Sequence, residues 1–199
     1  MNKTHDPASA PEDMTSAAVK PPAYRATPAL NAPATLEAFM AQALVMENEA
    51  VERYTDFADA METHNNPEVA AMFRTMAGYE TKHAQQIMAQ MGWTVAPVVE
   101  PDTYVWSSFD APEAAPIDSV HYLMQPWHAL QLALAAEQRA EAFFAALADA
   151  ASSDEGRKAA LELKAEEAEH VELVRAWLAK VPRPDNDWAN DPDPPRYTE

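Results

Sequence analysis

The sequence predicts an all-α protein, a four-helix bundle of two antiparallel hairpins joined by a long crossover, and three observations favour it. Helix-favouring Ala, Glu, Leu and Met are abundant, whereas only three of the 199 residues are Gly. The 17 Pro residues gather in 1–34, 93–118 and 181–199 and leave the segments between almost free of this helix breaker. Apolar residues in those segments recur every three or four positions, which is the spacing of one helix face.

The first hairpin is expected to contain helices over 35–63 and 67–91. Thr35 precedes the first apolar stripe and is a residue type that caps helix N-termini. Asn66 stands in the same position before the second helix, and Gly92 is expected to end that helix. The short turn between the two helices requires them to run antiparallel.

The second hairpin is expected over 126–151 and 154–180, with Asp154 as the cap of its second helix. The link between the hairpins, 93–125, is too long for a simple turn and carries enough apolar residues to lie along the helices. Two hairpins joined by one long crossover form the ferritin-like arrangement. The fold class predicted is therefore a ferritin-like four-helix bundle.

The chain is expected to divide into one domain and two arms. Residues 35–180 form the bundle, 1–34 a disordered Pro/Ala-rich arm, and 181–199 a disordered acidic Pro/Asp-rich tail. Trp188 and Tyr197 in the tail could contact a protein partner, although a solubilising tail is the simpler interpretation.

Composition excludes several kinds of function. The chain has no Cys, so disulfides, zinc-thiolate sites and Fe–S clusters cannot form within it, and electrons for any redox reaction must come from an external donor. A net charge of −18 repels nucleic acid and attracts cations. No apolar stretch is long enough for a membrane span or a signal peptide, so we expect a cytoplasmic protein without a membrane partner.

One pattern of acidic and imidazole residues occurs twice. In each half of the chain, a lone Glu on an apolar stripe is followed about one helix later by Glu-x-x-His, whose two side chains share a helix face. The candidate metal ligands are Glu47, Glu80 and His83 in the first half and Glu137, Glu167 and His170 in the second. Four carboxylates and two imidazoles converging in a bundle predict a two-metal site.

The two hairpins also resemble each other in sequence. Residues 43–50 align with 133–140, and Tyr54 then aligns with Phe144. A duplicated hairpin implies a pseudo-twofold axis, and a dinuclear site on that axis would use it directly.

Charge neutralisation is the physical reason for the metal prediction. Unpaired carboxylates on a buried helix face are costly and repel one another unless cations neutralise them. Two divalent ions balance four carboxylates, and oxygen ligands with imidazole suit iron, with manganese or a mixed iron–manganese pair as alternatives. Glu80 and Glu167 are expected to bridge the ions. The other ligands divide by half of the chain, Glu47 and His83 on one ion, Glu137 and His170 on the other.

The chain resembles the ferritin-like diiron superfamily, and within it the rubrerythrin and bacterioferritin branches. The resemblance covers about 35–180 and is carried by the segments Glu47–Tyr54, Glu80–His83, Glu137–Glu141 and Glu166–His170. It implies a pair of iron ions held by the six ligands and a reaction with dioxygen or hydrogen peroxide. The fold hosts many chemistries, so the resemblance specifies the ligand set better than the reaction.

Two departures from typical rubrerythrins stand out. Typical rubrerythrins carry an extra Glu three residues after the ligand on the third helix, and that position is here Ala140. The nearest substitute is Glu141, a candidate seventh ligand or proton carrier, although an edge residue is the simpler interpretation. The cysteine-rich rubredoxin domain is absent from this sequence. Tyr54, two turns after Glu47, is a candidate hydrogen-bond partner or electron donor, with a packed core Tyr as the alternative.

Three functional hypotheses follow from the residues and the resemblance. The first is a diiron oxidoreductase that reduces hydrogen peroxide or dioxygen with an external electron donor, in a role against oxidative stress. The second is a ferroxidase whose substrate is Fe(II) itself, steered by the acidic surface. The third is a metal-stabilised binding module whose arms recognise a protein partner. A homodimer is compatible with each of them.

Overall fold

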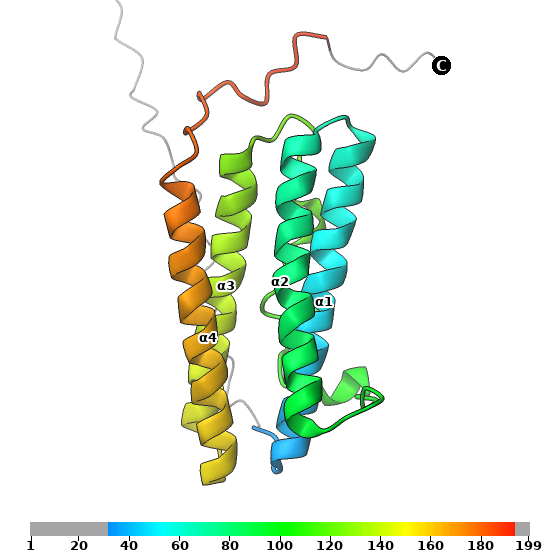
Figure 1. The fold of residues 1–199 in the computed structure, drawn as a ribbon, viewed down its shortest axis with the longest axis vertical. Helices are drawn as coiled ribbons and strands as arrows, with labels where there is room; N and C mark the ends of the chain where they lie inside the picture. The colour runs from blue at the N-terminus through cyan, green and yellow to red at the C-terminus, as the bar shows by residue number, and fades with distance from the viewer. Residues whose placement is uncertain (1–31, 194–199) are drawn as a thin grey trace, which may run out of the picture.

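The computed structural model describes residues 32–193, and within this range the protein is all-helical. Its elements are α1 (Leu36–Thr63), α2 (Pro67–Met91), the short 3-10 helices η1 (Pro101–Thr103) and η2 (Ile117–Ser119), α3 (Pro126–Ala150) and α4 (Asp154–Leu178). The four long helices run side by side as a bundle (Figure 1). The predicted fold class is confirmed.

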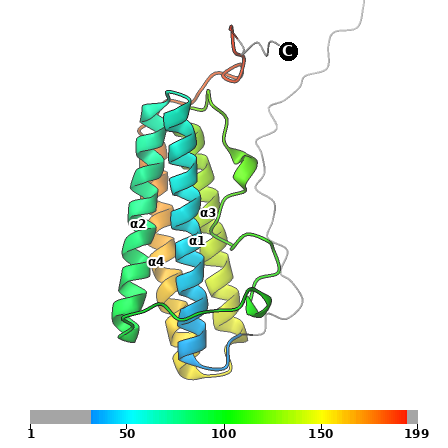
Figure 2. The ribbon, with the colours of Figure 1, turned by 90° about the vertical axis from the view of Figure 1, so that its right-hand side faces the viewer.

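The helices pair as the sequence predicts. α1 packs on α2 and α3 packs on α4, so each pair is a hairpin with a short turn. The crossover from α2 to α3 runs along the outer side of α1 and α3 and returns the chain to the other end of the bundle (Figure 2). No helix between residues 32 and 193 is both long and apolar enough to cross a membrane.

Local capping explains where the first hairpin's helices start and stop. The Thr35 hydroxyl accepts a hydrogen bond from the Ala38 N–H at 3.1 Å, which satisfies one of the free donors at the start of α1. Asn66 caps α2 in the same way. Gly92 ends α2 in the left-handed conformation, with φ of 67°.

The cap of α4 differs from the sequence prediction. Ser153, not Asp154, is the N-cap residue, and its hydroxyl accepts from the Gly156 N–H at 3.1 Å. Asp154 lies in the first turn instead, where a carboxylate interacts favourably with the helix dipole. Ser153 and Asp154 are adjacent and are both of good capping type, so the sequence alone did not determine which of them is the N-cap.

The apolar core is divided into two clusters along the bundle axis. One cluster, near the start of α1, includes Phe39, Leu44, Ile87, Phe144 and Leu163. The other, near the α1–α2 turn, includes Tyr54, Phe57, Phe73, Leu130 and Val174. On every helix the buried acidic residue lies in sequence between a stretch of one cluster and a stretch of the other. A polar layer therefore separates the two apolar clusters.

The described part of the predicted tail contacts the bundle. Trp188 packs on the His128 ring with centroids 3.9 Å apart, and the Tyr122 hydroxyl lies 2.7 Å from the Asp191 carboxylate. The division into a bundle and two arms stays a prediction, since residues 1–31 and 194–199, Tyr197 among them, lie outside the described residues.

Two glycines, Gly78 within α2 and Gly92 at its C-terminal cap, provide a test of the fold, because replacing them by Ala should change stability in opposite directions. Gly78 is exposed, and a methyl group there would meet nothing within 4 Å, so Gly78→Ala should stabilise the protein by about 0.5–1 kcal/mol through helix propensity. Gly92→Ala should destabilise it by about 1 kcal/mol, because Gly92 has φ of 67°. Urea unfolding of the metal-free variants measures both changes. Equal effects would contradict the described end of α2.

Candidate metal centre

Each long helix contributes one glutamate to the polar layer. Glu47 lies on α1, Glu80 on α2, Glu137 on α3 and Glu167 on α4, and all four have 0% of their surface exposed. Each occupies a position on the apolar face of its helix, so the helical period that buries the core also turns these carboxylates inward. The structure therefore brings the four predicted glutamates together.

The histidines join the carboxylates in two similar half-sites. In one, His83 Nδ1 lies 3.5 Å from Glu47 Oε2 and 3.6 Å from Glu80 Oε2. In the other, His170 Nδ1 lies 3.4 Å from Glu137 Oε2 and 3.7 Å from Glu167 Oε2. These are ion-pair separations rather than good hydrogen bonds. Each half-site presents two oxygens and one nitrogen to a common point.

The two half-sites adjoin each other. The rings of His83 and His170 are stacked, with centroids 4.4 Å apart and planes inclined by 8°. Ligand atoms of Glu80, His83 and His170 lie within 4.8 Å of one another, and so do those of Glu47, His83 and Glu167. Glu80 and Glu167 each approach groups of both half-sites, as Glu47 also does, so the assignment of Glu80 and Glu167 as the bridging carboxylates stays a prediction.

The carboxylate oxygens have no protein donors. Both side-chain oxygens of Glu47, Glu80, Glu137 and Glu167 are buried without a hydrogen-bond partner in the described part of the chain. Burial, followed by repulsion from the neighbouring carboxylates, raises the pKa of Glu47 and of Glu80 well above the usual value. Buried acids arranged with imidazoles and without donors fit a pair of cations, so the residues suit a diiron site.

The two histidines differ in their preference for a proton. Burial lowers the pKa of His83. Burial also acts to lower the pKa of His170, but its contacts with Glu137 and Glu167 outweigh this and raise the pKa to about 11. In the metal-free protein, a proton on His170 would partly neutralise the layer, and a cation binding there would have to displace it.

The structure places the other two candidate site residues differently. Tyr54 is 1% exposed, and its hydroxyl has no hydrogen-bond partner within the described range. Burial, followed by the charges of Glu137 and Glu80, raises the pKa of Tyr54, so the phenol stays protonated next to the layer. Glu141 is only partly buried and belongs to none of the acid and imidazole clusters among residues 32–193. A role for either residue stays a prediction.

One further buried acid was not expected. Glu113 in the crossover is 0% exposed, and its ligand atoms lie within 4.8 Å of those of Glu47 and Glu80. The sequence surrounds it with Asp110-Ala111-Pro112 and Ala114-Ala115, which has no helical period to indicate a face. The small, apolar neighbours were the available signal that this stretch could be buried, but they do not say against which residues.

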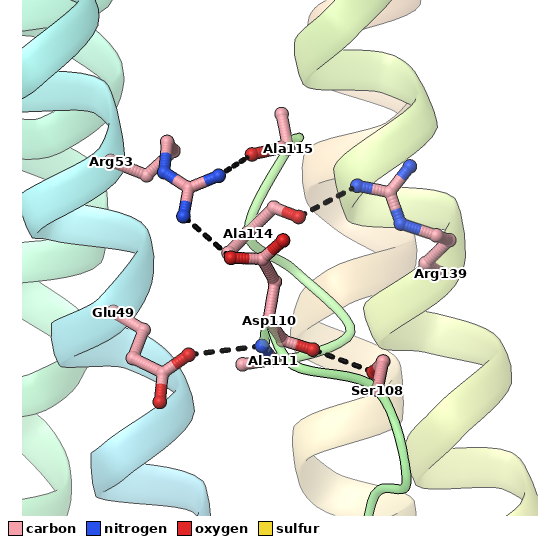
Figure 3. Close-up of polar contacts among 8 residues, drawn as sticks. All are labelled: Glu49, Arg53, Ser108, Asp110, Ala111, Ala114, Ala115 and Arg139. Atoms are coloured by element: carbon pink, nitrogen blue, oxygen red, sulfur yellow. Dashed lines mark hydrogen bonds and ion pairs between the residues drawn. The ribbon is translucent and has the colours of Figure 1, made fainter. Parts of the chain in front are cut away.

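The crossover is held over the layer by side chains of α1 and α3. Arg53 of α1 donates to the Ala115 carbonyl and to Asp110 Oδ1, and Glu49 accepts from the Ala111 N–H at 2.9 Å (Figure 3). Arg139 of α3 donates to the Ala114 carbonyl at 3.3 Å and to the Pro112 carbonyl at 2.8 Å. Residues 111–115 are all buried beneath these contacts.

The fold and the site define a ferritin-like helical bundle with a candidate dinuclear centre of the Glu/His type. The sequence model of the rubrerythrin family matches residues 38–178, and the chain therefore belongs to the rubrerythrin family. It is also similar to a solved structure, an uncharacterised conserved protein from Magnetospirillum magnetotacticum MS-1. The two share 36% sequence identity with a TM-score of 0.56, over 76% of this chain and 98% of that one. No curated protein matches the chain.

The metal-free protein should lose stability as the pH rises through neutrality. Burial raises the pKa of Glu167 from 4.5 to about 7, so the folded state holds this proton more tightly than the unfolded state. Stability from this group is full below pH 4.5 and is lost as the pH rises through about 7. Thermal unfolding of the metal-free protein between pH 4.5 and 8 should show a falling midpoint, and Glu167→Gln should fall less steeply.

The matched control for that measurement is Glu169→Gln. Glu169 is two residues from Glu167 on the same helix but is exposed, so its variant should follow the wild type. Adding Mn(II) at pH 7 should raise the midpoint of the wild type and of this control, because the ion neutralises the layer. An equally steep fall in Glu167→Gln would show that this carboxyl does not hold the buried proton.

Proposed function

We propose that this chain is a non-haem diiron oxidoreductase of the rubrerythrin type, which reduces hydrogen peroxide or dioxygen with electrons from an external donor. One observation carries the proposal. Two Glu-x-x-His half-sites meet in a buried layer whose carboxylate oxygens have no protein donors. Such a layer suits two iron ions held by Glu47, Glu80, His83, Glu137, Glu167 and His170.

When bound, a pair of iron ions supplies the two electrons that, with two protons, convert hydrogen peroxide to two waters. The protein would position the ions and supply the negative charge of the carboxylates that hold them. Glu80 and Glu167 each approach groups of both half-sites, so these two carboxylates would hold both ions and position them for the reaction. An external donor would return the electrons to the site, and the lack of Cys in the given sequence is consistent with this.

The rest of the bundle isolates this chemistry. The apolar clusters on either side of the layer restrict water, which strengthens the electrostatic interactions within it. The Tyr54 hydroxyl, protonated and without another partner in the described chain, is available as a hydrogen-bond donor at the edge of the layer. We include Tyr54 as a positioning residue for a ligand or for the oxidant.

Ferroxidase activity is the second candidate, and the net charge favours it. A charge of −18 attracts Fe(II) toward the protein, so the ion could be a substrate as well as a cofactor. A binding module whose tail recognises a partner has less support. Trp188, the described aromatic residue of that tail, already packs on His128 and His121 of the same chain.

The test is a stopped-flow experiment on protein loaded with Fe(II) without oxygen. The loaded wild type should be oxidised by peroxide or by oxygen at least about 100-fold faster than Fe(II) in buffer. Glu167→Ala should lose this advantage because it removes a carboxylate that reaches both half-sites. The matched control is Glu169→Ala, which changes an exposed residue of the same helix and should react as the wild type does.

The same experiment separates the candidates. An oxidoreductase stops after the bound ions are oxidised and continues only with an added reductant, whereas a ferroxidase continues with added Fe(II). If the loaded wild type reacts no faster than Fe(II) in buffer, both enzymatic proposals are wrong.

A further inference from the structure

Glu113 is a buried acid for which the six-ligand site gives no role. It lies in the crossover rather than on a helix, yet 0% of its surface is exposed. Neither of its side-chain oxygens has a hydrogen-bond partner in the described chain. Burying an ionised carboxylate without a partner costs several kcal/mol unless a positive charge or a proton neutralises it.

Neither of the two nearby arginines, Arg53 and Arg139, donates a hydrogen bond to the Glu113 carboxylate. Arg53 directs its donors to the Ala115 carbonyl and to Asp110. Arg139 directs its donors to the carbonyls of Pro112 and Ala114. Both guanidinium groups hold the backbone around Glu113 and leave its carboxylate unpaired. An acid retained for a purely structural ion pair would be expected to accept from one of them.

The contacts that hold the crossover also limit where the Glu113 side chain can lie. Its segment is anchored to α1 through Arg53 and Glu49 and to α3 through Arg139, as Figure 3 shows for the contacts around it. Three anchors within 110–115 hold the backbone firmly against both helices. The side chain is therefore held in place rather than left free on a flexible loop.

The carboxylate of Glu113 lies next to one half-site. Its ligand atoms are within 4.8 Å of those of Glu47 and Glu80, which belong to the half-site of His83. Among the described residues, the cluster formed by Glu137, Glu167 and His170 has no corresponding fourth member. The pseudo-twofold symmetry of the helices is thus broken by a residue of the crossover.

We propose that Glu113 is a seventh metal ligand, supplied by the crossover to the ion at the Glu47, Glu80 and His83 position. This inference rests on the metal site proposed above. It makes the two positions unequal, because one ion meets an additional carboxylate and the other does not. The position next to Glu113 then binds a divalent cation more tightly and fills first.

The experiment compares Glu113→Gln with Glu100→Gln in the full chain. Both variants replace a crossover carboxylate by an amide of nearly the same shape, but Glu100 is exposed. Metal-free protein is titrated with Mn(II), with the free ion followed by electron paramagnetic resonance. The wild type and Glu100→Gln should bind two ions with unequal affinity. Glu113→Gln should lose at least about 10-fold in the tighter affinity, with the weaker one unchanged.

Thermal unfolding of the metal-free variants gives an independent readout. Replacing a buried acid that has no partner by a neutral amide should raise the midpoint of Glu113→Gln above that of the wild type. A residue needed only for packing of the crossover would instead lower it. A variant that fails to fold without metal would therefore count against the proposal.

The outcomes distinguish this inference from the proposed function. If the wild type binds two Mn(II) ions and Glu113→Gln binds them equally well, the assignment of Glu113 is wrong and the six-ligand site stands. If the wild type binds no Mn(II), the metal site itself is wrong, and Glu113 loses its proposed role with it.

Discussion

The structure depends on a layer of buried carboxylates that the protein's own side chains neutralise only in part. Glu47, Glu80, Glu137 and Glu167 lie at the centre of the bundle, each fully buried and without a donor in the described chain. This layer splits the hydrophobic core in two, so the bundle gives up continuous apolar packing where it would be most effective. Cations bound in this layer would replace the missing packing with coordination, and metal binding would then couple the stability of the bundle to its function.

The two hairpins are similar, but their outer faces have diverged to hold the crossover. In the internal alignment, Glu49 of α1 corresponds to Arg139 of α3. Glu49 accepts from a backbone N–H of the crossover, whereas Arg139 donates to two of its carbonyls. Equivalent positions thus carry opposite charges, each matched to the backbone groups that it meets. These contacts satisfy the polar backbone of a buried loop, which would otherwise be costly to cover.

The sequence predicted the features that follow from the helical period, but it did not predict the placement of residues in segments that have no such period. Apolar stripes and capping residues such as Thr35 and Asn66 determined the four helices, and the same stripes turned the two Glu-x-x-His pairs inward. The sequence did not decide between Ser153 and Asp154 as the N-cap of α4, because two adjacent residues of capping type differ only in register. The sequence also did not predict that Glu113 lies beside the ligands. The position of this loop residue follows from contacts of its segment with Arg53 and Arg139, which are distant in sequence. Glu141 is the seventh acid that proximity in sequence favours, but among the described residues it lies outside the clusters of the ligands.

A carboxylate on the crossover also alters the charge balance of the layer. Four glutamates balance two divalent ions, so oxidation of both ions would leave an excess of two positive charges in a region of low dielectric. With Glu113 ionised as a fifth carboxylate, the reduced site would carry one excess negative charge and the oxidised site one excess positive charge. Because unbalanced charge is costly in the interior, a fifth carboxylate would shift the preference of a bound ion pair toward the oxidised state. The crossover would then act on the reactivity of the site as well as connecting the two hairpins.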